Sequence, residues 1–128
     1  MSGLVVDTSV WIDFLAGRPV GALEDALLQG VVTLPPMVVA ELVSGARIAK
    51  QRAAVTDLVH DLPVLATPVD HWIRVADLRR QLAEKGIAIS TPDAHVAQCT
   101  IDLDGLLLTR DAVFDKIARH SGLRIASR

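Results

Sequence analysis

The sequence predicts an α/β fold in which a parallel sheet lies between layers of helices. Short apolar runs such as Leu4-Val5-Val6 have the character of strands buried on both faces. Segments with the helical spacing of apolar residues separate these runs along nearly the whole chain. Such alternation is typical of parallel sheets, because each crossover between two parallel strands usually contains a helix.

Local signals predict the individual elements. Pro36 suits the first turn of a helix, since its missing N–H group would have no helical partner there. Gly30 and Gly86 are expected to end the helices before them. In the first half of the chain we expect a strand at 4–6, a helix capped by Thr8 or Ser9, a helix at 22–29, a strand at 31–34, and helices at 37–50 and 51–62. In the second half we expect a strand at 64–66, a helix at 70–85, a helix from about 93, a strand at 105–109, a helix at 111–119 and a last strand at 123–125.

The segment 70–85 has the clearest amphipathic pattern. Its apolar stripe is expected to face inward and consists of Trp72, Val75, Ala76, Leu78 and Leu82.

Composition favours a globular protein. Hydrophobic residues make up 51% of the chain and charged residues 22%, so we expect residues 1–128 to form a single domain with a real core. No apolar run is long enough to cross a bilayer, and the first strand leaves no room for a signal peptide, so a cytoplasmic location is expected. Cys99 is the single cysteine, which excludes an internal disulfide and a thiolate cage and favours a small, buried, apolar role. The net charge of −2 does not by itself indicate nucleic-acid binding, although a bound metal ion can supply positive charge locally.

Carboxylates from distant parts of the chain are expected to meet at one edge of the sheet. Asp7 ends the first strand and Asp111 closely follows the strand at 105–109, and ligands of open α/β sheets usually lie at these carboxyl ends. Glu41 lies in the helix after the second strand, and Asp93 begins the helix that leads to the strand at 105–109. Taken alone, Asp7 would be a turn residue and Glu41 a surface glutamate, and the other two aspartates would be helix N-caps.

The mutual repulsion of clustered carboxylates is relieved when a cation binds among them. Two unit charges about 4 Å apart repel by roughly 4 kcal/mol at an effective dielectric near 20. Oxygen ligands, without a usable set of Cys or His, favour a hard ion, Mg²⁺ or alternatively Mn²⁺. Such a site suits hydrolysis of a phosphodiester, because the metal lowers the pKa of a bound water.

At these carboxylates the sequence resembles the PIN-domain ribonucleases, and in particular the VapC-type toxins of bacterial toxin–antitoxin pairs. The matching motifs occur in the family's order and span nearly the whole chain. They are Val6-Asp7-Thr8-Ser9-Val10-Trp11-Ile12, Ala40-Glu41-Leu42-Val43-Ser44-Gly45, Thr91-Pro92-Asp93-Ala94-His95-Val96-Ala97 and Leu108-Thr109-Arg110-Asp111-Ala112-Val113-Phe114. Each motif alone is weak, whereas four in register are specific.

The resemblance implies a PIN-like α/β/α sandwich with a central, mostly parallel five-stranded sheet. It implies that Asp7, Glu41, Asp93 and Asp111 form a catalytic site for Mg²⁺ or Mn²⁺, with Ser9 as a hydroxyl neighbour. It also implies a metal-dependent endoribonuclease that uses water as the nucleophile, forms homodimers and is inhibited by a cognate VapB-type antitoxin.

Several residues near the motifs are candidates for accessory roles. Thr109 lies beside the proposed site, and Arg110 is the best candidate for a contact with an RNA phosphate. Asp115, one helical turn after Asp111, is either a fifth ligand or a solvated helix residue. His95, where the family tends to have an aliphatic residue, would either orient a ligand, contact RNA or be structural.

Other residues with reactive or aromatic side chains are given ordinary structural roles. Asp13, Asp102 and Asp104 are expected at the surface, and Trp11 and Trp72 in the core or at a dimer interface.

Three rival functions remain to be weighed. An aspartate-based phosphatase would need a second aspartate two residues after Asp7, where this chain has Ser9. A phosphoacceptor receiver domain would need a lysine after a late strand, and none occurs between Lys85 and Lys116. A catalytically weak PIN-like binding module is the alternative outside enzymes, although the presence of all four carboxylates disfavours it.

Overall fold

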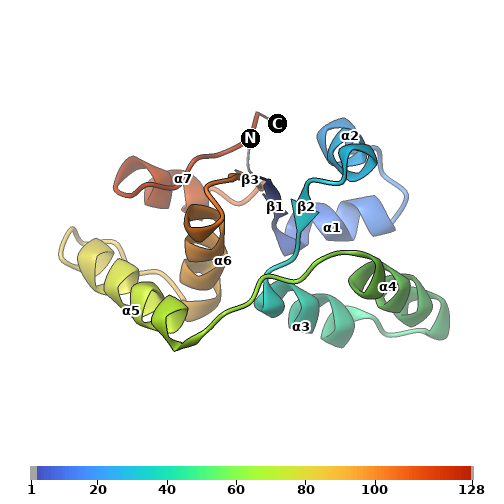
Figure 1. The fold of residues 1–128 in the computed structure, drawn as a ribbon, viewed down its shortest axis with the longest axis horizontal. Coiled ribbons are helices and arrows are strands. Elements are labelled where there is room, and N and C mark those ends of the chain that lie inside the picture. Colours follow the sequence, from blue (N-terminus) through green and yellow to red (C-terminus); the bar gives the residue numbers. More distant parts are fainter. Residues whose placement is uncertain (1–2, 128) are drawn as a thin grey trace.

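The computed structural model describes residues 3–127 and places helices on both sides of a parallel sheet (Figure 1). The sheet contains β1 (Leu4–Val6), β2 (Val32–Thr33) and β3 (Leu106–Leu108), in the order β2-β1-β3. Both pairings are parallel. The strand β1 is therefore central, and all three of its residues are buried, as the apolar run predicts.

Single bridges continue the sheet on both sides of these strands. Leu34, directly after β2, pairs in parallel with Val64, and Leu107 of β3 pairs in parallel with Ile125. The strands expected at 64–66 and 123–125 are thus present only as bridges, because each outer segment exchanges just two backbone hydrogen bonds with its neighbour. The α/β/α sandwich predicted from the sequence is confirmed, with its sheet reduced to three regular strands and two flanking bridges.

The helices fill the connections between the strands. They are α1 (Thr8–Leu15), α2 (Gly21–Gln29), α3 (Pro36–Gly45), α4 (Ala49–Asp61), α5 (Val69–Ala83), α6 (Thr91–Asp102) and α7 (Val113–Arg119). In Figure 1, α1 and α2 lie to one side of the strands, and α5, α6 and α7 lie to the other. The helix α6 packs against β1, β3 and α3, and it lies beside α5. Among residues 3–127, no helix is long and apolar enough to cross a membrane.

Most helix boundaries lie within about two residues of the predicted ones; α7, for example, begins at Val113 rather than at residue 111. Pro36 is the first residue of α3, and Gly30 follows α2 with a φ of 70°. The helix expected at 37–50 ends at Gly45, because the side chain of Gln51 accepts from the N–H groups just before α4 and supports a new helix start there. The helix α6 begins at Thr91 rather than near residue 93, because the hydroxyl of Ser90 caps it.

The helix α5 buries a different set of residues from the one expected. Val75, Leu78 and Leu82 are buried as predicted. Trp72 is 36% exposed and Ala76 is exposed, whereas His71 is only 1% exposed. An imidazole can occupy this interior position because it finds hydrogen-bond partners on α6.

A close approach of two backbones positions the ends of β1 and β3. A Cβ atom on Gly105, just before β3, would lie 2.6 Å from the carbonyl oxygen of Gly3, just before β1. Only glycine fits at such a distance without moving the backbone. The two strands therefore run side by side from their first residues, and they deliver Asp7 and Thr109 to the same edge.

Candidate functional site

Asp7 lies directly after β1, and three donors fix the orientation of its carboxylate. The backbone N–H of Thr8 donates to Oδ1 at 2.8 Å, and the hydroxyls of Ser9 and Thr109 donate to Oδ2 at 3.1 and 3.0 Å. Asp7 is itself the N-cap of α1, so the expected cap at Thr8 or Ser9 is wrong. Ser9 is the hydroxyl neighbour of Asp7, as expected. The carboxylate is thus held in place at the carboxyl edge of the sheet.

Thr109 connects Asp7 to Asp111. Its side chain is buried, and the same Oγ1 that donates to Asp7 accepts from the N–H of Asp111 at 3.0 Å. Asp111 in turn accepts at Oδ1 from the N–H of Val113, the first residue of α7, at 3.0 Å. One hydroxyl therefore couples the carboxylate after β1 to the segment after β3.

Glu41 and Asp93 approach the same edge from α3 and α6. The hydroxyl of Thr8 donates to Oε1 of Glu41 at 2.9 Å, which links α3 to the start of α1. Partial burial is the largest effect on Asp93 and raises its pKa, against the hydrogen bond with Ser90, which lowers it. The negative charges of Asp111 and Asp7 raise the pKa further by smaller amounts. The bond from Thr8 thus places Glu41 beside the start of α1, and Asp93 lies close enough to Asp7 and Asp111 for their charges to act on it. The four predicted carboxylates therefore lie toward the same end of the sheet.

The four carboxylates surround this edge without closing a cage. Among residues 3–127, no three of them bring ligand oxygens within 4.8 Å of one another. Carboxylate oxygens are the ligands that Mg²⁺ and Mn²⁺ prefer, and Mg²⁺ usually keeps several waters while binding one or two carboxylates. A cation here would also stabilise the ionised form of Asp93, whose pKa is raised by burial and, to a smaller extent, by the neighbouring carboxylates. The donor set therefore fits a hard divalent ion.

The accessory candidates lie around this site in different environments. Arg110 is half-exposed and pairs with Asp13, which also pairs with Arg18. Asp13 is thus a largely covered ion-pair partner rather than the simple surface residue expected. Asp115 lies in the first turn of α7 and is partly buried.

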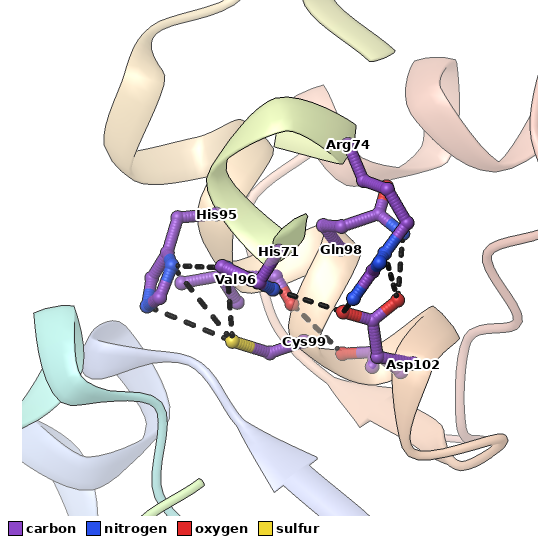
Figure 2. Close-up of polar contacts among 8 residues, drawn as sticks. His71, Arg74, His95, Val96, Gln98, Cys99 and Asp102 are labelled. Carbon is purple, nitrogen blue, oxygen red and sulfur yellow. Dashed lines mark hydrogen bonds and ion pairs between the residues drawn. The ribbon is translucent and has the colours of Figure 1, made fainter. Parts of the chain in front are cut away.

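Sequence reasoning missed a second group of polar side chains, which lies between α5 and α6 (Figure 2). His71, His95 and Cys99 are buried, and a ligand atom from each lies within 4.8 Å of the others. Asp102, expected at the surface, joins this group by accepting from Nδ1 of His71 at 2.9 Å. That these Cys and His side chains lie together was not anticipated from the sequence. Four-residue spacing on a helix could have paired His95 with Cys99, but nothing local identifies His71.

Comparison with known proteins decides the family. The PIN domain family model matches residues 4–120. The chain belongs to the PIN domain family. PIN domains are generally nucleases, so this membership supports a hydrolase. A search of curated proteins finds no match.

Solved structures with this PIN fold include chains from VapBC complexes. Relative to DNA-bound VapBC from Salmonella typhimurium, the TM-score is 0.79 at 22% identity, over 98% of this chain and 98% of that one. VapBC2 from Rickettsia felis, bound to a DNA fragment from its promoter, gives 0.77 at 20% identity over 96% of each chain. VapBC-5 from Mycobacterium tuberculosis, a member of the VapBC family of toxin–antitoxin systems, gives 0.73 at 25% identity over 100% of each chain. The PIN fold thus extends over essentially the whole chain.

Proposed function

We propose that this PIN domain is a metal-dependent endoribonuclease of the VapC toxin type, restrained by a VapB-type antitoxin. The observation that carries the proposal is the linkage of Asp7 to Asp111 through the buried hydroxyl of Thr109. A buried hydroxyl that ties the Asp7 carboxylate to the backbone of Asp111, in a distant segment, suits a shared site better than two separate helix caps. The VapBC complexes of the same fold support the toxin class and its kind of partner.

Asp7, Glu41, Asp93 and Asp111 would hold Mg²⁺ or Mn²⁺. When bound, the ion supplies Lewis acidity toward the phosphodiester and a nearby water. Asp7 enters this role already oriented by three donors, so it loses little freedom on binding. Thr8 similarly restrains Glu41 through its hydroxyl. The chain therefore contributes preorganised negative charge, which gathers the cation that an acidic protein needs near RNA.

Arg110 is proposed to contact a phosphate of the RNA. Its half-exposed guanidinium follows Thr109 directly and is held by Asp13. A planar guanidinium can bind two phosphate oxygens at once. Arg110→Ala is expected to raise KM more than it lowers kcat, and to reduce the salt slope of RNA binding by about 1.

An apolar groove between α1, α3 and α4 is proposed to receive the antitoxin. The groove has a volume of about 260 Å³, and its lining includes Ile12, Leu42 and Val55 together with Glu41. Ile12 is 55% exposed, so the groove presents apolar surface to solvent. A partner segment in this groove would lie against Glu41 and so restrain the site.

The homodimer and the cytoplasmic location expected from the sequence also stay predictions. Light scattering of the purified chain would measure its oligomeric state.

The deciding experiment is cleavage of a total RNA pool by purified protein. Discrete fragments should appear with Mg²⁺ or Mn²⁺, disappear with EDTA and be lost in Asp7→Asn. The matched control is Asp104→Asn, because the side chain of Asp104 is 84% exposed and pairs only with Arg124 among the ion pairs described for residues 3–127. No cleavage by folded protein free of copurified inhibitor would refute the nuclease and leave the binding module. Cleavage that Asp7→Asn retains would refute the site.

A further inference from the structure

His71 and His95 face each other between α5 and α6, and Cys99 completes a triangle with them (Figure 2). Nε2 of His71 lies 2.8 Å from Nδ1 of His95, and Sγ of Cys99 lies 3.9 Å from each of these nitrogens. A tetrahedral zinc ion, with Zn–N near 2.0–2.1 Å and Zn–S near 2.3 Å, holds such atoms roughly 3.3–3.6 Å apart. Shifts of about 0.5 Å or less would therefore convert the observed triangle into zinc-binding geometry.

Asp102 orients His71 in the manner of the outer partner of a metal ligand. It accepts from Nδ1 of His71 at 2.9 Å, and it is itself held by Arg74 through two bonds of 3.0 Å and by Gln98 at 2.9 Å. Because an ionised carboxylate only accepts, the proton of His71 is on Nδ1 and Nε2 presents its lone pair toward the triangle. Metal-ligating histidines almost always have such a carboxylate or carbonyl on the second nitrogen.

Without metal, the remaining protons follow from this orientation. Nδ1 of His95 donates to His71, and Nε2 of His95 accepts from the N–H of Met37 at 3.4 Å. Within residues 3–127, the hydrogen-bond contacts of Cys99 Sγ are long ones to ring nitrogens, from 3.6 to 3.9 Å. Burial raises the pKa of this thiol to about 12, so it stays protonated until a cation compensates the charge.

We propose that Nε2 of His71, Nδ1 of His95 and Sγ of Cys99 form a zinc site that clamps α5 to α6. Two imidazole nitrogens and one thiolate are a borderline-soft set that suits Zn²⁺ and disfavours Mg²⁺ and Mn²⁺. Binding releases the thiol proton of Cys99 to solvent. It also moves the proton of His95 from Nδ1 to Nε2, so the hydrogen bond to His71 and the long contact with Met37 give way to two bonds to the metal.

Trp72 gives this site a cover and a reporter. Its ring stacks on that of His95 with centroids 4.7 Å apart and an interplanar angle of 7°, and it meets the ring of His71 edge-on at 5.1 Å. Because Trp72 is partly exposed while both histidines are buried, it separates the imidazoles from solvent. The helix α6 begins with the turn that contains Asp93, so a clamp on α6 would steady that turn without belonging to the carboxylate site.

Cobalt(II) is the probe that tests the site, because it replaces zinc in tetrahedral sites and absorbs light. Metal-free, reduced protein titrated with Co²⁺ should develop a thiolate-to-cobalt charge-transfer band together with strong tetrahedral d–d absorption, saturating at one ion per chain. Since Cys99 is the only cysteine, the charge-transfer band identifies its ligand without any variant. Zn²⁺ should abolish the band, an excess of Mg²⁺ should leave it, and Trp fluorescence should change in parallel.

Variants then separate the two proposed metal sites. Asp7→Asn should keep the cobalt band, and Cys99→Ala should lose it along with the rise in Tm that Zn²⁺ gives the wild type. Asp102→Asn should weaken cobalt binding about 10–100-fold, since it removes the partner of His71.

The wild-type titration decides the proposal even if Cys99→Ala fails to fold. Folded wild-type protein without a charge-transfer band, or a band that persists in a folded Cys99→Ala or Cys99→Ser protein, would overturn it. Neither result depends on RNA cleavage, so the nuclease proposal stands or fails separately.

Discussion

Replacing Thr109 with valine should detach the acidic site from its support while preserving the fold. Valine has nearly the shape of threonine, but it places a methyl group where the hydroxyl donates to Asp7 and accepts from the N–H of Asp111, both at 3.0 Å. The Asp7 carboxylate would keep its bonds from Thr8 and Ser9, and would be free to turn about them. The backbone of Asp111 would lose a buried acceptor.

The size of the effect follows from these two bonds. A hydrogen bond to a charged group contributes about 1.5–3 kcal/mol, and partial exposure of Asp7 places this one at the lower end. We expect the free energy of unfolding to fall by about 1–2 kcal/mol, since the isosteric change leaves no cavity. Loss of an outer partner of a metal ligand typically weakens metal affinity or activity about 10–100-fold. The half-saturating concentration of Mg²⁺ for RNA cleavage should rise by this factor, and excess Mg²⁺ should recover much of the rate.

The assay is the initial rate of RNA cleavage across a range of Mg²⁺ concentrations, alongside urea unfolding. Thr109→Ser should restore both the rate and the stability. Thr100→Val is the matched control, because Thr100 is equally buried and its hydroxyl donates to the carbonyl of Val96 on its own helix, at 3.0 Å. An unchanged Mg²⁺ dependence in Thr109→Val would refute the coupling of Asp7 to Asp111.

Three further predictions concern the scaffold. Asp102→Asn should lower the free energy of unfolding by roughly 1–3 kcal/mol in urea titrations, because it weakens the hydrogen bonds that three side chains make to a carboxylate that is 20% exposed. As a control, Asp104→Asn should stay within about 0.5 kcal/mol of wild type. Gly105→Ala should lower the free energy of unfolding by about 1–3 kcal/mol and reduce RNA cleavage, because the new Cβ would lie 2.6 Å from a backbone oxygen. Gly122→Ala has open space around its Cβ and should be neutral. Equal stability of the two variants would contradict the close approach of β1 and β3. In metal-free native protein at pH 8, Cys99 should react very slowly with Ellman's reagent, because a pKa raised to about 12 leaves only about 10⁻⁴ of the thiol ionised, and urea should release fast labelling.

Local chemistry in the sequence predicts much of this molecule. The apolar run that ends at Asp7, Pro36 at a helix start and Gly30 at a helix stop each act through their immediate neighbours, and each appears where expected. The gathering of carboxylates also follows from the sequence, because parallel strands bring their carboxyl ends to one edge. The structure places those residues together, and their role as catalytic ligands stays a proposal that RNA cleavage tests.

The tertiary structure alone decides which side chains meet. Thr109 reaches Asp7 across 102 positions of sequence, and no local pattern marks that hydroxyl as the support of the site. On α5, hydrophobicity favours burying Trp72, yet His71 is the residue inside, because α6 offers its imidazole two partners and leaves the indole to stack above. Helix period and capping depend on residues a few positions apart, whereas hydrogen-bond partners in the interior depend on how distant segments pack. The sequence by itself therefore determines the order of the elements and the edge at which the acids gather, and only packing determines the hydroxyl that supports them and the buried histidine pair beside them.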